Sequence, residues 1–119
     1  MRKKYTIQHI DGITEIRCDQ APTYNNARAI IDDVAANFPY EKRLWDFSNV
    51  AFDFTMDELR SIAEYGKMVF TQPNKVALVA TQDLAYGELR AFEVYRDQVE
   101  HATARVFRTR QEALAWLKK

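Results

Sequence analysis

The sequence predicts one α/β domain over residues 1–119, in which helices pack on a mixed sheet, and three observations lead to this prediction. The chain has 119 residues, which suits one hydrophobic core and is too short for two. Hydrophobic residues make up 47% and charged residues 29%, as in an ordinary globular protein. Short apolar runs alternate with apolar patterns of helical period. The predicted order is strand, strand, helix, strand, helix, strand, helix, strand, helix.

Residues 4 to 18 are predicted to form a β-hairpin around Asp11-Gly12. This dipeptide accepts the positive φ angles that a two-residue type I′ turn requires. A helix then opens after Pro22, with Thr23 as its cap, and ends before Pro39. Apolar residues recur within it at three- and four-residue spacing: Ala27, Ile30, Ile31, Val34 and Phe38.

The segment from Arg43 to Phe47 is dense in aromatic and aliphatic residues and too short for a helix, so we predict a buried strand. Thr55 and Glu58 have the spacing of a capping box, in which each side chain bonds the backbone amide of the other residue. A second helix therefore begins here. Its predicted inner residues are Leu59, Ile62, Ala63, Gly66, Met68 and Val69.

Residues 75 to 80 form an apolar run typical of a central parallel strand, and we expect this strand to be the most buried. A third helix is predicted from Leu84 to about Val99, with Leu84, Leu89, Phe92, Tyr95 and Val99 on its inner side. Residues 104 to 107 are the last predicted strand, and Thr109 caps a final helix that ends at residue 117. Strands separated by helices of this length run parallel, and their crossovers are right-handed.

Charge and cysteine content exclude several classes of protein. Basic and acidic residues number 17 each, so no global field favours nucleic acid or an anionic membrane. Cys18 is the only cysteine, which rules out an intrachain disulfide and a CxxC pair. No apolar run approaches the roughly 18 residues of a membrane span, and no export signal is visible. We expect a cytoplasmic protein without a transmembrane segment.

Catalytic and metal-binding patterns are also missing from the sequence. His9 and His101 have no histidine or cysteine at ligand spacing, so we expect no metal site and no cofactor. No Ser, His and Asp order, glycine-rich phosphate loop or HExxH motif is present. Cys18 lies in or just after a predicted strand, away from any helix N-terminus, and is interpreted as a packed, inert thiol. We therefore expect no catalytic residue and no enzyme activity.

Two groups of residues are candidates for ligand binding. Tyr86 and Arg90 lie one helical turn apart, and an aromatic ring beside an arginine can anchor a mostly apolar ligand. Arg105, Arg108 and Arg110 cluster around the last strand and helix, where they can hold an anion or simply decorate the edge of the sheet. We interpret the arginine cluster as edge decoration and keep the pair of Tyr86 and Arg90 as a possible ligand pocket.

Five segments, in this order along the chain, carry a resemblance to a known family: Arg43–Phe47, Thr55–Leu59, Lys75–Ala80, Ala85–Arg90 and Val106–Leu117. The chain resembles the STAS superfamily, specifically the SpoIIAA-like (STAS/SEC14) bacterial proteins. The resemblance spans nearly the whole chain and implies the STAS fold. It implies a non-enzymatic regulatory or binding module that acts by contact with a protein partner, such as a kinase or an anti-sigma-like factor, or with a second copy of itself.

Anti-sigma factor antagonists of this superfamily carry Asp-Ser-Ser-Gly at the start of a helix, and a serine there is phosphorylated. The matching stretch here is Asp53-Phe54-Thr55-Met56, so the resemblance implies a phosphoacceptor-like position at Thr55 with Asp53 as its acid. Two positions differ, because phenylalanine replaces the first serine and methionine replaces the glycine. A plain helix cap accounts for Thr55 completely, and we favour it. The family name also implies a second function, the binding of a small hydrophobic or anionic, lipid-like ligand.

Overall fold

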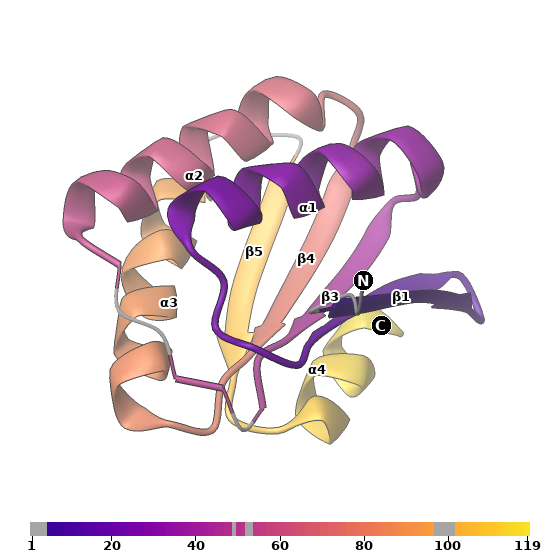
Figure 1. Ribbon diagram of the computed structural model, residues 1–119. Coiled ribbons are helices and arrows are strands. Elements are labelled where there is room, and N and C mark those ends of the chain that lie inside the picture. The colour runs from indigo at the N-terminus through magenta and orange to yellow at the C-terminus, as the bar shows by residue number, and fades with distance from the viewer. Residues whose placement is uncertain (1–4, 49, 52–53, 97–101) are drawn as a thin grey trace.

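The computed structural model describes residues 5–48, 50–51, 54–96 and 102–119, and these form one five-stranded sheet with four helices packed on it (Figure 1). The strands lie in the order β1-β2-β3-β4-β5. The elements are β1 (Tyr5–Ile10), β2 (Ile13–Cys18), α1 (Tyr24–Asn37), β3 (Lys42–Asp46), α2 (Met56–Val69), β4 (Asn74–Val79), α3 (Asp83–Arg96), β5 (Ala102–Phe107) and α4 (Arg110–Leu117). The predicted α/β class, mixed sheet and element order are confirmed.

The hairpin forms as the sequence predicts. β1 and β2 pair antiparallel, and Ile10 lies opposite Ile13 across a two-residue turn. The φ angles of Asp11 and Gly12 are 54° and 80°, the left-handed values of a type I′ turn. The chain reverses here because these two residues tolerate a backbone conformation that most side chains disfavour.

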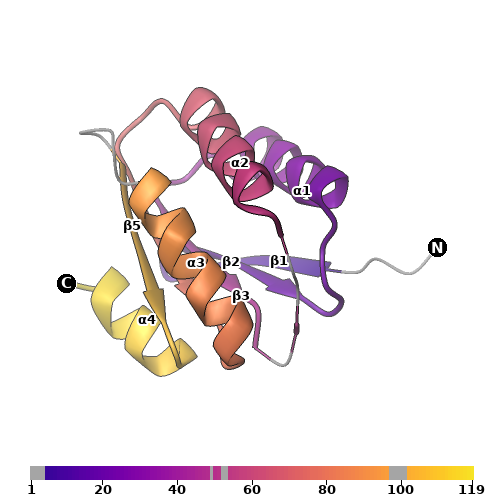
Figure 2. The same ribbon diagram turned by 90° about the vertical axis from the view of Figure 1, so that its left-hand side faces the viewer.

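Connection geometry places three helices on one face of the sheet. β2, β3, β4 and β5 run parallel and are neighbours in that order, so each crossover advances in the same direction. Right-handed crossovers that advance in one direction deliver their helices to one face. Figure 2 shows α1, α2 and α3 on that face and α4 on the other.

Threonines begin three of the helices, as the sequence predicts. The hydroxyl of Thr23 accepts a hydrogen bond from the amide of Asn26, and that of Thr109 accepts one from the amide of Glu112. Thr55 and Glu58 form the complete, reciprocal capping box. These bonds satisfy amides of the first helical turn that have no partner within the helix.

Two residues predicted to face inward are exposed. Met68 of α2 is 66% exposed, because it follows buried Gly66 by two residues and therefore lies on the opposite side of the helix. Leu84 of α3 is 59% exposed, because the inner side of the first turn belongs to Ala85, in line with Leu89. Val99, also predicted to face inward, lies outside the described residues.

The two faces of the sheet have separate cores. Residues alternate along each strand, so one set of side chains points toward α1, α2 and α3 and the other toward α4. The larger cluster includes Ile16, Cys18, Ile30, Val34, Phe47, Val76, Leu78, Ala85, Leu89 and Val106. The smaller cluster consists of Ile13, Leu44, Ala77, Val79, Ala113 and Leu117.

Candidate functional site

An apolar pocket lies between the sheet and the three helices that cover its larger core. Trp45 of β3, Phe47 directly after this strand, and Val76 and Leu78 of β4 lie on its sheet side. Its interior measures ≈ 70 Å³, and the whole depression, including the part open to solvent, measures ≈ 710 Å³. The other lining residues are Cys18, Pro22, Ala27, Ile30, Ile31, Arg43, Phe54, Leu59, Ile62, Gly66, Phe70, Leu89 and Phe92. The pocket is therefore suited to an apolar group and is not built for acid–base chemistry.

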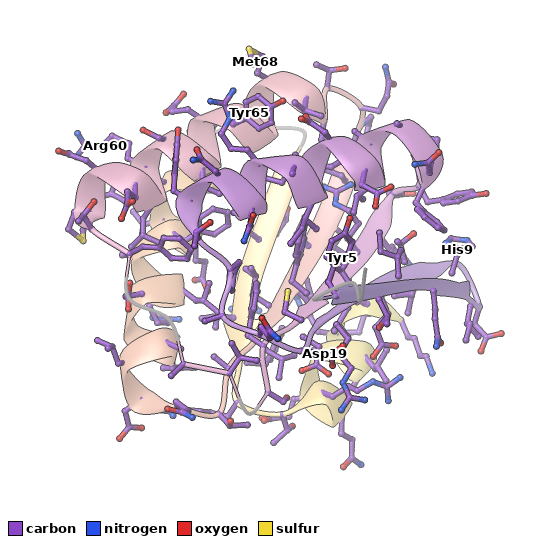
Figure 3. The ribbon with its side chains drawn as sticks, in the orientation of Figure 1. Tyr5, His9, Asp19, Arg60, Tyr65 and Met68 are labelled. Carbon is purple, nitrogen blue, oxygen red and sulfur yellow. The ribbon has the colours of Figure 1, made fainter. Side chains whose placement is uncertain are left out.

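The helices α1 and α2 lie side by side (Figure 1). Both contribute residues to the pocket, and side chains on their outer side join them. The hydroxyl of Tyr65 on α2 donates to the carboxylate of Asp32 on α1, and this bond raises the pKa of Tyr65. The guanidinium of Arg28 lies 4.3 Å from the centre of the same ring. Figure 3 shows Tyr65 on the outward side of α2. These contacts join the two helices to each other above the pocket.

A buried arginine closes the end of the pocket where the parallel strands begin. Arg43 is 1% exposed, and one of its terminal nitrogens donates to the side-chain oxygen of Asn74 at 2.9 Å. The other donates to the carbonyl of Tyr40 at 3.3 Å, and the guanidinium lies 3.7 Å from the centre of the Phe70 ring. Arg43 thus ties the starts of β3 and β4 to the segments that follow α1 and α2.

Phe54 lines the pocket beside α2 and α3. Its backbone amide donates to the carboxylate of Glu88 on α3, and its ring packs against the larger core. The next residue, Thr55, begins α2 through the capping box. The Glu88 side chain of α3 therefore fixes the backbone of Phe54, just before α2.

Cys18 is a packed thiol in the pocket lining. It is 3% exposed, and burial raises its pKa from 9.0 to about 12, with a further contribution from the nearby carboxylates of Asp19 and Asp46. The thiolate is the reactive form of cysteine, so this residue is a poor nucleophile at neutral pH. The interpretation of Cys18 as inert agrees with this environment.

Thr55, the predicted phosphoacceptor-like residue, is exposed at the first turn of α2. Its hydroxyl accepts from the amide of Glu58 at 3.1 Å, and its own amide donates to the Glu58 carboxylate at 2.9 Å. The helix-cap interpretation therefore describes its contacts. Asp53, the predicted acidic partner, lies outside the described residues.

The structure gives Tyr86 and Arg90 different neighbours. Tyr86 is half-buried, and the guanidinium of Arg108 lies 4.0 Å from the centre of its ring while also donating to Asp83 at 2.9 Å. Arg90 is exposed and pairs with Glu93 at 3.5 Å. Neither residue is part of the pocket lining. Their joint role in ligand binding stays a prediction.

Other charged groups make contacts within the fold. Arg110 at the start of α4 forms two hydrogen bonds with the carboxylate of Glu15, at 2.5 and 2.8 Å. Asp33 accepts from the hydroxyl of Tyr5 at 2.7 Å, and this bond is the main reason why the pKa of Tyr5 rises to about 12.

Among the described residues, no group of three His, Cys, Asp or Glu side chains is arranged to hold a metal ion. None of the described helices has the length and hydrophobicity needed to cross a membrane.

Sequence reasoning did not identify the pocket residues as a site. The available signal was the alternation Arg43, Trp45, Phe47, which places one charged and two aromatic side chains on the same face of a buried strand. That pattern alone does not separate a pocket wall from an ordinary core. Comparison with known proteins adds no assignment, because neither a family model nor a curated protein matches this sequence significantly.

Proposed function

We propose that this chain is a non-enzymatic binding module of the SpoIIAA-like (STAS/SEC14) type, and that it holds a small apolar ligand in the pocket beneath α1 and α2. The observation that carries the proposal is the pocket itself. It is open to solvent, and nearly all of its lining side chains are aliphatic or aromatic. Ligand sites are typically concave and mostly apolar, with few polar groups. In this proposal the module is a regulatory protein of the bacterial cytoplasm.

The dimensions of the pocket limit the ligand. An interior of ≈ 70 Å³ is about half of the roughly 150 Å³ found in an engineered cavity that binds benzene. The lining runs from Arg43 in β3 to Phe47 directly after this strand, which is about 13 Å at roughly 3.3 Å per residue. The shape therefore favours a narrow aliphatic group in the interior, with the rest of the ligand in the open part of the depression.

Native mass spectrometry tests this proposal with a matched pair of variants. Ala27 lines the pocket and Ala29 is exposed on the same helix, so Ala27→Leu fills the pocket while Ala29→Leu adds the same group outside it. The protein is measured as purified and after addition of 1-hexanol. We expect a bound apolar molecule in the wild type and in Ala29→Leu, and none in Ala27→Leu. If no bound molecule distinguishes the two variants in either sample, the proposal is wrong.

A second candidate function, protein contact at the start of α2, is favoured by one observation. Thr55 is exposed there beside Met56, an apolar side chain that is 55% exposed. This is the surface through which the family resemblance implies contact with a kinase or an anti-sigma-like factor. Incubation with serine/threonine kinases, followed by mass spectrometry of the Thr55 peptide, tests the switch. Absence of phosphate on that peptide, together with unchanged partner binding by Thr55→Glu, would exclude it.

A further inference from the structure

The two edges of the sheet differ in how they are covered. At the β5 edge, the Glu93 carboxylate of α3 accepts a hydrogen bond from the backbone amide of Val106 at 2.8 Å. Figure 2 shows α3 running alongside β5. A side chain that occupies an edge amide prevents another strand from pairing there. The β5 edge is therefore protected.

At the opposite edge, β1 pairs with β2 on one side, and no other strand of the described sheet lies beyond it. The type I′ turn makes Ile10 and Ile13 a hydrogen-bonded pair, and such pairs alternate along an antiparallel ladder. Gln8 and Thr6 therefore bond toward β2. The backbone groups of Ile7 and His9 point outward from the sheet.

Natural edge strands usually carry features that prevent pairing with another strand, such as charges, proline or a bulge. The sequence of β1, Tyr5–Ile10, contains no charged residue, proline or glycine. Its register with β2 is continuous from Tyr5 opposite Cys18 to Ile10 opposite Ile13, so it has no bulge. Ile10 is 58% exposed at the end of the strand. β1 is thus six residues of regular, uncharged edge.

We propose that β1 pairs antiparallel with β1 of a second copy of this chain, about a two-fold axis at Ile7. This register sets Ile7 opposite its own copy and Tyr5 opposite His9 of the other chain. A charged residue at or beside the two-fold axis would lie near its own copy and be repelled, and β1 carries no charged residue. Because the β5 edge is protected, the sheet that the described residues form has one open edge, and the assembly closes at two copies. This pairing is independent of the pocket and its ligand.

Hydrogen exchange followed by NMR tests the proposed register directly. The chain is measured from micromolar to millimolar concentration, with sedimentation giving the mass at each point. We expect the mass to double as concentration rises, and the amides of Ile7 and His9 to exchange about tenfold more slowly, or slower still, in the dimer. Thr6 and Gln8 bond to β2 in both states, so their amides serve as internal controls. A chain that stays monomeric throughout, or a dimer in which Ile7 and His9 exchange at the monomer rate, overturns the proposal.

A chain that carries one methyl group on the backbone nitrogen of Ile7 is the matched variant for this test. Cys18 allows a synthetic segment of residues 1–17 to be ligated to a recombinant segment that begins at residue 18. N-methylation of Ile7 in the synthetic segment removes one outward donor and leaves every side chain and every bond to β2 in place. We expect the methylated chain to be monomeric with an unchanged circular dichroism spectrum, while the unmethylated ligation product dimerises. A dimer of equal strength in both products contradicts the β1 pairing.

Discussion

The two faces of the sheet are covered in different ways, and only one of them leaves a pocket. α4 lies directly over β4 and β3, and its Ala113 and Leu117 pack against Leu44, Ala77 and Val79, all fully buried. On the other face, α1 and α2 pack chiefly on neighbouring helices, and the space beneath them is the pocket. A short helix that closely follows its strand in sequence packs directly on the sheet. Two helices that pack on each other can leave a space between themselves and the sheet.

Equal additions of volume to the two faces test this difference most strongly. Ala113→Leu forces three carbon atoms into the filled face, and we expect a loss of about 1–3 kcal/mol in the free energy of unfolding. Ala27→Leu adds the same atoms to the pocket, where space exists, and we expect a change within about 0.5 kcal/mol. Urea denaturation of the full chain measures both.

Ala29→Leu is the control for helix propensity, since its side chain is exposed. Alanine and leucine are both strong helix formers, so this variant is expected to resemble the wild type. Equal losses in Ala113→Leu and Ala27→Leu, relative to this control, would mean that the two faces are packed alike.

Alkaline pH has a smaller effect on stability, which arises on the pocket side of the sheet because Cys18 lies there. Burial raises its pKa in the folded protein to about 12, above its ordinary value of 9.0. Between these values the folded chain keeps a proton that the unfolded chain releases, so stability falls as pH rises from 9 toward 12. Tyr5, raised to about 12 from 10.0, contributes in the upper part of the same range.

The measurement is the urea midpoint of unfolding as a function of pH. We expect Cys18→Ala to show a shallower decline than the wild type from pH 9 upward, with the remaining slope due in part to Tyr5. An identical decline in both proteins would show that the thiol titrates as freely in the folded chain as in the unfolded one.

Local signals in the sequence predicted the fold because their causes are local. Asp11-Gly12 accepts left-handed backbone angles, and Thr55 with Glu58 caps α2, whatever surrounds them. The inner side of a helix is set by its neighbours as well as by its own pattern. Met68 and Leu84 were therefore wrongly predicted to face inward. The inner side at these places is occupied by Gly66 and Ala85, two small buried residues close to them in sequence.

The pocket could not be predicted because it depends on how far α1 and α2 stand from the sheet. Arg43 shows this limit. The strand pattern predicted its burial, but the Tyr40 carbonyl and the Asn74 side chain that accept its hydrogen bonds belong to other segments. Tyr86 and Arg90 show the converse. Their spacing of one helical turn suggested a shared site, but Tyr86 contacts Arg108 beyond β5, whereas Arg90 pairs with Glu93 within α3.

A crystal structure of the protein under xenon pressure shows whether the space beneath α1 and α2 exists, because xenon enters dry apolar cavities. We expect a xenon atom between Trp45 and Ile62, beneath α1 and α2, and none between Ala77 and Ala113 on the other face. A pocket without xenon, or xenon bound equally on both faces, would contradict this expectation.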